Sequence, residues 1–164
     1  MLRALVLEGV RLEVPSNVPV MVLREVDAPQ RILPIFIGAP EAASIHHATS
    51  GIVPERPLTH DLLVDVLGSL DASLTQVVVT EVRDHTYYAE LHLVAGGRAV
   101  TVSCRPSDAV AIAVRTGSPI FAEADLMDEA GREAPEARQE EGEETIIDDF
   151  RDFINRVSPE DFGG

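Results

Sequence analysis

The sequence predicts an α+β fold class: a mixed, largely antiparallel sheet meander with helices packed on it, in a single compact domain. Three observations lead to this prediction. Several segments alternate apolar and polar residues as half-buried strands do, short turn clusters join them, and other segments show helical spacing behind capping residues. With 164 residues and 45% hydrophobic content, the chain can build one domain with a real core.

The N-terminal part is predicted to form a meander of three strands. Residues 2–14 alternate along their length, and turn clusters separate them from strands at 20–26 and 31–37. Connections this short favour antiparallel neighbours. Pro34 falls inside the third strand, and because proline lacks a backbone donor, it indicates an edge position or a bulge.

Two helices are expected next. The first starts with Pro40 and is closed by Gly51, with Ala42 and Ile45 facing inward. Thr59 is the expected N-cap of the second, amphipathic helix. The apolar stripe of this second helix consists of Leu62, Leu63, Val66, Leu67 and Leu70.

The second half of the chain predicts a further group of strands and a buried helix. The strands lie at 74–82, 86–95, 98–104 and 119–122, and a short acidic helix follows at 123–130. Gly96-Gly97 is typical of a tight hairpin. Ser107 is the expected N-cap of a helix whose body, Ala109 to Val114, is apolar all round. A short helix without a polar face is usually buried.

The predicted domain covers residues 1–130, and two further segments follow it. Residues 131–142 form an acidic linker with the composition of a disordered segment. Residues 143–164 form a C-terminal amphipathic helix and tail, which needs a surface to dock on. The apolar residues that recur there at helical spacing are Ile146, Ile147, Phe150, Phe153, Ile154 and Val157.

The charge of this acidic protein is unevenly distributed. Of the net charge of −15, −11 falls in residues 123–164, and every basic side chain is arginine. Tight, non-specific binding of duplex nucleic acid depends on basic side chains that neutralise phosphates, so this composition argues against it. A local site for one strand of nucleic acid remains compatible with the sequence.

Other features of the chain narrow the class of protein. No apolar run approaches the roughly 18 residues of a membrane span, and charges interrupt the N-terminus, so a cytoplasmic protein is expected. A single Cys104 leaves no intrachain disulfide and no cysteine-based metal cluster. His46 and His47 are adjacent, so they cannot easily bind one metal from a single helix face. The common motifs of nucleotide-binding proteins, zinc peptidases and serine hydrolases do not occur.

Two helix starts carry the candidate functional residues. Arg105, Ser107 and Asp108 stand where backbone N–H groups and the helix dipole favour an anion, so they form a candidate phosphate site. The alternative is an ordinary capped helix in which Arg105 and Asp108 pair with each other. His60 and Asp61 occupy the first turn of another helix, and the sequence leaves open whether the two turns converge.

Four blocks in order resemble the bifunctional nuclease (BFN) domain family over about residues 1–130. These blocks are Leu33–Gly38, Glu41-Ala42, Pro57–Leu62 and Arg105–Ala113. The resemblance implies a compact α+β fold, a homodimer and, as for some members of the family, hydrolysis of both RNA and DNA.

The resemblance also singles out residues for a hypothesis of metal-assisted phosphodiester hydrolysis. Asp61 and Asp108, with Glu41, would hold Mg²⁺ or Mn²⁺, because carboxylate oxygens suit these hard cations. His60 would be the general base or acid, with Asp61 and Asp108 completing the catalytic set, and Arg105 and Ser107 would bind the phosphate.

Two alternatives stand beside the nuclease hypothesis. The same helix starts could form the pocket of a non-catalytic ligand-binding or regulatory protein, because the chain has no basic stripe and few aromatic residues on which bases could stack. The blocks could also simply hold the fold, for instance through a buried Arg105–Asp108 pair.

Overall fold

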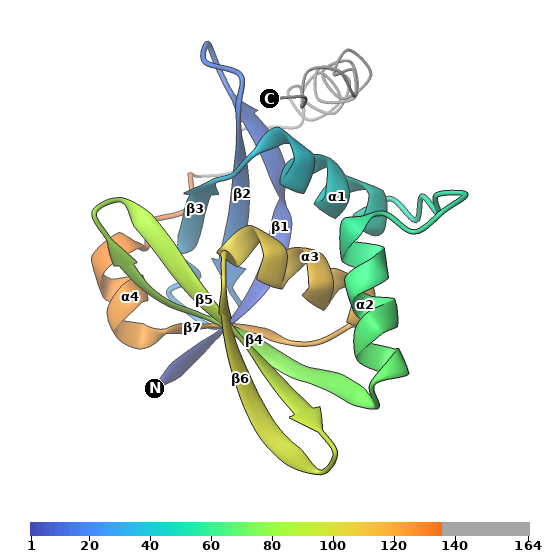
Figure 1. Cartoon of the computed structure of the whole chain (residues 1–164). Coiled ribbons are helices and arrows are strands. Elements are labelled where there is room, and N and C mark those ends of the chain that lie inside the picture. The colour runs from blue at the N-terminus through green and yellow to red at the C-terminus, as the bar shows by residue number, and fades with distance from the viewer. Residues whose placement is uncertain (136–164) are drawn as a thin grey trace.

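The computed structural model describes residues 1–135, which form one seven-stranded sheet with four helices (Figure 1). The strand order is β3-β2-β1-β7-β4-β5-β6, and every neighbouring pair is antiparallel except β4 and β7. The strands are β1 (Leu2–Glu13), β2 (Val18–Glu25), β3 (Ile32–Phe36), β4 (Ala72–Arg83), β5 (Thr86–Ala95), β6 (Arg98–Cys104) and β7 (Ile120–Glu123). The predicted fold class, an α+β domain with a mixed and largely antiparallel sheet, is confirmed.

Local sequence explains the turns and one edge of this sheet. Asp84 and His85 both have positive φ in the two-residue turn between β4 and β5, and Gly96 and Gly97 do the same between β5 and β6. Such turns match the twist of the strands that they join. Pro34 lies in β3, which is an edge strand, as the missing proline donor predicts.

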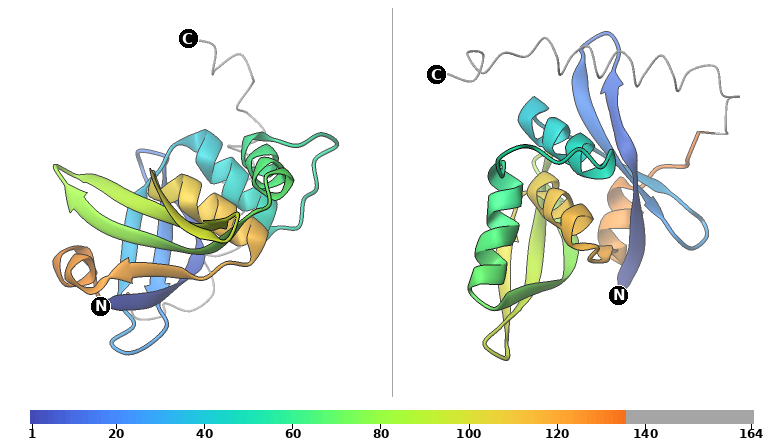
Figure 2. Two further views of the ribbon diagram at one scale, coloured as in Figure 1. Left: turned by 60° about the horizontal axis from the view of Figure 1, so that its bottom comes forward. Right: turned by 90° about the vertical axis from the view of Figure 1, so that its right-hand side faces the viewer.

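The four helices are α1 (Ala39–Thr49), α2 (Thr59–Ser69), α3 (Pro106–Thr116) and α4 (Ala124–Ala130). The first three lie together, whereas α4 lies apart from them and packs on β4, β7 and β1 (Figures 1 and 2). Helix α3 is the buried centre of the group, since its apolar body packs against α1, α2, β4 and β5. Ala42 and Ile45 of α1 are buried as expected.

Both helix starts that carry candidate residues differ from the predicted capping. Helix α3 begins at Pro106 with Arg105 as N-cap, so Ser107 lies inside the first turn and is buried. Helix α2 has Leu58, and not Thr59, as N-cap. There the Asp61 carboxylate accepts a hydrogen bond of 2.9 Å from the Leu58 backbone N–H, which replaces the expected threonine cap.

Helix α2 also turns a different face toward the core than its apolar stripe predicts. Its buried residue is His60, with Val64 and Leu67 partly buried behind it. Most of the predicted stripe is exposed instead, namely Leu62, Leu63, Val66 and Leu70. Polar contacts at its N-terminus and the packing of Val64 and Leu67 therefore hold the helix, and its apolar flank is exposed within residues 1–135.

The last described residues contact the edge of the sheet. Arg132 forms an isolated antiparallel bridge with Ile32, so the first residues of the predicted linker 131–142 contact β3. The rest of that linker and the predicted helix at 143–164 lie outside the described residues. No helix within residues 1–135 is long and apolar enough to cross a membrane.

Candidate active site

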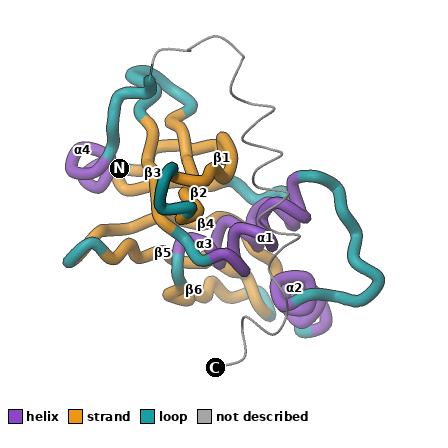
Figure 3. The backbone as a smooth tube through the Cα atoms, turned by 90° about the horizontal axis from the view of Figure 1, so that it is seen from above, coloured by secondary structure: helices purple, strands orange, loops and turns teal. Residues whose placement is uncertain are grey.

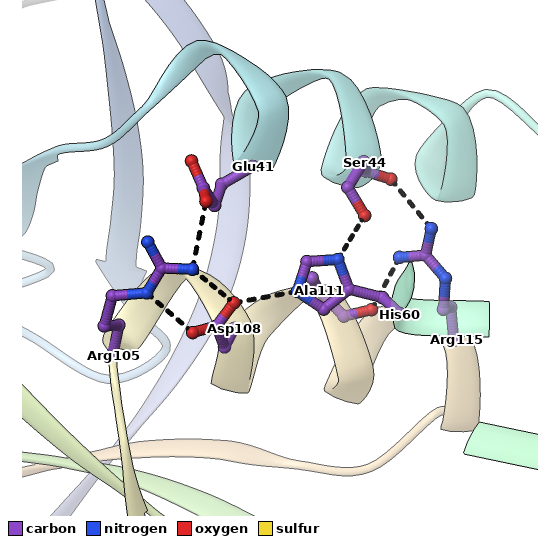
Figure 4. Close-up of polar contacts among 7 residues, drawn as sticks. All are labelled: Glu41, Ser44, His60, Arg105, Asp108, Ala111 and Arg115. Carbon is purple, nitrogen blue, oxygen red and sulfur yellow. Dashed lines mark hydrogen bonds and ion pairs between the residues drawn. The ribbon is translucent and has the colours of Figure 1, made fainter. Parts of the chain in front are cut away.

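The two helix starts converge. The Nε2 atom of His60, in the first turn of α2, lies 2.8 Å from Oδ1 of Asp108 in the first turn of α3 (Figure 4). Helix α1 lies over both and closes the site with Glu41 and Ser44. Three helices that are separated in sequence thus supply one group of polar side chains.

His60 is buried and bonded through both ring nitrogens. Its side chain contacts Asp108 through Nε2, and Nδ1 lies 2.7 Å from the hydroxyl oxygen of Ser44. Burial raises the pKa of the Asp108 carboxyl, but hydrogen bonds from Arg105 and His60 outweigh it and hold the pKa below the ordinary value. With a neutral imidazole, the ionised Asp108 therefore accepts the Nε2–H, and Nδ1 accepts the proton of the Ser44 hydroxyl.

Arg105 brings a positive charge to the surface at this point. Its Nε and Nη2 atoms donate to the Asp108 carboxylate at 2.7 and 2.9 Å, and Nη2 also lies 2.9 Å from Oε1 of Glu41. The hydrogen bond to Asp108 raises the pKa of the guanidinium, so Arg105 stays charged. The Arg105 side chain is 63% exposed, which leaves it accessible to an anion in solution.

A second ion pair extends the group toward the end of α3. Arg115 donates from Nε to Oδ1 of Asp61 at 2.7 Å, and from its two terminal nitrogens to the carbonyl oxygens of Ala111 and Ser44. The hydrogen bond from Arg115 holds the pKa of the Asp61 carboxyl below its ordinary value. Since Ser44 contacts His60 by its hydroxyl and Arg115 by its carbonyl, the two ion pairs are linked.

We call this linked set the polar network. Its members are Glu41, Ser44, His60, Asp61, Arg105, Asp108 and Arg115. Of the residues singled out from the sequence, Glu41, His60, Arg105 and Asp108 meet directly. Asp61 joins through Arg115, and Ser107 lies buried beside the network in the first turn of α3. The pairing of Arg105 with Asp108, one of the alternatives left open, is present.

Sequence reasoning missed Ser44 and Arg115. Serine in the middle of a helix carries no pattern of its own, and an arginine in the last turn of a helix is common because it suits the helix dipole. One signal was available for Arg115. An arginine that ends an otherwise buried helix is expected to find a carboxylate, and Asp61 is a nearby candidate in the predicted site.

The predicted metal ligands do not meet around one point. Arg115 engages Asp61, whereas Glu41 and Asp108 share Arg105. Within residues 1–135, no group of three His, Cys, Asp or Glu side chains is placed to hold a metal ion. Guanidinium groups neutralise these carboxylates in this arrangement, so Mg²⁺ or Mn²⁺ would have to displace an arginine to bind there.

The fold and the polar network define an α+β domain with a histidine–aspartate–arginine site at the meeting point of three helices. The chain belongs to the bifunctional nuclease domain family, because the model of that family matches residues 21–135. It is also similar to an uncharacterized protein of Mycobacterium tuberculosis, found in strains CDC 1551 and H37Rv. The identity is 42% over 158 residues, which cover 94% of each chain.

Proposed function

We propose that the protein is a nuclease that hydrolyses phosphodiester bonds in RNA and DNA at the polar network. The observation that carries the proposal is the position of Arg105, an exposed guanidinium held by two carboxylates beside the buried His60–Asp108 pair. A guanidinium group binds phosphate oxygens through charge-assisted hydrogen bonds. Membership of the bifunctional nuclease domain family supports the same activity.

The proposed roles follow from the hydrogen bonds. Arg105 binds the scissile phosphate and stabilises the charge that develops on it. His60 accepts a proton at Nδ1, and Asp108 stabilises the imidazolium that results. Because the Ser44 hydroxyl is bonded to Nδ1, it relays this proton from the attacking water, and the leaving oxygen takes the proton back from the imidazolium as its bond to phosphorus breaks. Asp61 acts through Arg115, as a positioning residue.

Several predictions made from the sequence remain part of this proposal. Phosphate binding by Ser107 and assistance by Mg²⁺ or Mn²⁺ are kept as predictions, and no step is assigned to the ion. We also expect a homodimer in the cytoplasm. A local site, and not a basic groove, would contact the RNA or DNA strand.

The test is a cleavage assay on labelled single-stranded RNA and DNA, with Mg²⁺, Mn²⁺ or EDTA. Losing one group that stabilises transition-state charge costs about 10²–10³-fold in rate, so Arg105→Ala should lose about that much. Arg83→Ala is the matched control, because Arg83 is equally exposed but lies at the β4–β5 hairpin and pairs with Glu81. EDTA-sensitive cleavage would support metal assistance. Equal rates for the parent and Arg105→Ala would contradict the proposed site.

A second candidate function is the binding of a ligand without catalysis. A groove of about 390 Å³ lies next to the network, and its lining includes Ile52, Pro54 and Val114 together with Asp61 and Arg115. A network of ion pairs beside an apolar groove is also an arrangement expected of a rigid ligand-binding site. No cleavage by the pure parent protein, combined with a rise in melting temperature on adding a small ligand, would favour this function.

A further inference from the structure

Exposed apolar side chains gather on helix α2. No other helix or strand within residues 1–135 carries as many exposed large apolar side chains as α2 with its two capping residues. Helical spacing places them on one flank of the helix. They are Leu58, Leu62, Leu63, Val66 and Leu70. Because a contiguous exposed patch of this kind typically marks an association site, another apolar surface is expected to cover this flank.

Strand β6 adds two valines to the apolar surface on this side of the molecule. Val100 and Val102 pair with Leu93 and Leu91, so they lie on the face of the sheet that carries the core, yet they are 41% and 42% exposed. Helix α2 and β6 lie on the same side of the molecule (Figures 2 and 3). We call the α2 flank together with Val100 and Val102 the α2–β6 surface.

Two exposed arginines stand at the ends of the α2–β6 surface. Arg56 precedes the first turn of α2, and Arg98 begins β6. Arg98 pairs with Ala95, which in turn pairs with Ala72 at the start of β4, so Arg98 lies near the C-terminal end of α2. Neither arginine forms an ion pair within residues 1–135. An apolar surface between two such positive charges suits an acidic, amphipathic occupant.

The sequence that follows the described residues contains a segment of this character. Its apolar residues recur at helical spacing, and they are Ile146, Ile147, Phe150, Phe153, Ile154 and Val157. Carboxylates precede and separate them, namely Glu143, Glu144, Asp148, Asp149 and Asp152. A short amphipathic helix is stable only when its apolar side packs against another surface.

We propose that residues 143–157 form an amphipathic helix that docks on the α2–β6 surface of its own chain. The apolar side of this helix packs against the α2 flank and the two valines, and its carboxylates pair with Arg56 and Arg98. Since α2 supplies His60 and Asp61 to the polar network, the docked helix also holds one wall of the candidate active site. The docking itself does not depend on the proposed nuclease function.

The chain beyond Pro135 is long enough to reach this surface. Arg132 is bonded to Ile32 of β3, which lies at the opposite edge of the sheet from β6. The strand spacings between these two edges amount to about 29 Å, whereas residues 135–146 span up to about 36–40 Å when extended. A tethered segment has an effective concentration in the millimolar range. A second copy lacks this advantage and, at a net charge of −15, is repelled.

Engineered disulfides in the full chain test the docking. In a Cys104→Ser background, which leaves no other thiol, Val66→Cys with Phe150→Cys should form an intramolecular disulfide on mild oxidation. In the first control, Asn155→Cys replaces Phe150→Cys, because helical spacing puts Asn155 on the polar side of the segment. In the second control, Val94→Cys replaces Val66→Cys, because Val94 is exposed on the opposite face of the sheet.

The rates of disulfide formation distinguish the possible occupants. The first pair should react at least about tenfold faster than either control, because only that pair is held together by more than the tether. Equal rates for all three pairs would show that the segment is tethered but not docked. A disulfide between two chains would place a second copy on the surface, and absence of any disulfide would leave the surface to another protein. Each of these three results would overturn the proposal.

Reversing the two arginine charges provides the second measurement. Arg56→Glu combined with Arg98→Glu should slow the intramolecular disulfide by about three- to tenfold at low salt, because exposed ion pairs are individually weak. Added salt should reduce this difference, since it screens exposed charges. The control Arg83→Glu, at the β4–β5 hairpin, should leave the rate unchanged. A rate that the double reversal does not alter would contradict the proposed charge pairing.

Discussion

Replacing Asp108 with alanine removes the carboxylate that joins α3 to α2, and the structure gives the expected cost. The His60–Asp108 hydrogen bond, 2.8 Å long and largely buried, contributes about 1.5–3 kcal/mol, as bonds to charged groups do. The pair with Arg105 adds only about 0–1 kcal/mol, because the guanidinium is mostly exposed. Asp108→Ala should therefore lower the free energy of unfolding by about 1.5–4 kcal/mol.

Urea unfolding followed by circular dichroism measures this loss at neutral pH. Since the folded-state pKa of Asp108 lies below its ordinary 3.8, the stabilisation is complete above that value and disappears as the pH falls through the folded pKa. The difference between parent and variant should shrink over the same range. Asp65→Ala, on the exposed flank of α2, is the control. If Asp108→Ala costs no more than the roughly 0.5 kcal/mol of an ordinary surface substitution, the network does not hold these helices together.

Three further predictions concern other side chains. Glu25→Gln should cost about 3–5 kcal/mol in urea unfolding, because the buried Glu25 accepts hydrogen bonds of 2.9 and 3.0 Å from the Arg31 guanidinium. That bonding lowers the pKa of Glu25, so the cost should be present above its ordinary pKa of 4.5 and vanish in acid. Arg115→Ala should lower the melting temperature, and Arg115→Lys should recover only part of it, because an ammonium lacks the planar fork that reaches Asp61 and two carbonyls. Full recovery by lysine would contradict this geometry. Cys104 should react slowly with iodoacetamide at pH 8 and faster toward its pKa of about 11; fast alkylation at pH 8 would contradict its burial.

The strands could be predicted from the sequence because their signals are local. Alternation fixes which residues face the core, and turn residues such as Gly96-Gly97 fix the hairpins that join neighbours. The parallel pairing of β4 with β7 carries no such signal. It joins residues about forty positions apart through a strand of only four residues, and this contact depends on how the whole chain packs.

The orientation of α2 shows why periodicity alone is an incomplete guide. The spacing of its leucines and valines correctly indicates a helix with one apolar side. It does not indicate which surface covers that side. In the folded chain, polar contacts by His60 and Asp61 at the first turn set the rotation of the helix, so most of the stripe faces outward.

The sequence predicts several residues of the site, but it does not predict all of the residues to which they are hydrogen-bonded. His60 and Asp108 stand in helix first turns, and Arg105 is the N-cap of α3, so all three mark helix starts. Ser44 and Arg115 join the network through bonds to residues at least 16 positions away, and no local pattern encodes such bonds. The predicted metal ligands illustrate the same limit, since three carboxylates in a sequence do not reveal which arginines neutralise them.

Strand β7 determines when the sheet can become continuous during synthesis. It binds β1 on one side and β4 on the other, and no other strand within residues 1–135 connects the meander β1–β3 to the meander β4–β6. The ribosome delivers Ile120–Glu123 after all six other strands. Both meanders therefore emerge with an additional open edge, at β1 and at β4, until this last short segment joins them. A chain that stops before it would hold two separate three-stranded sheets, each with an edge that invites association with other chains.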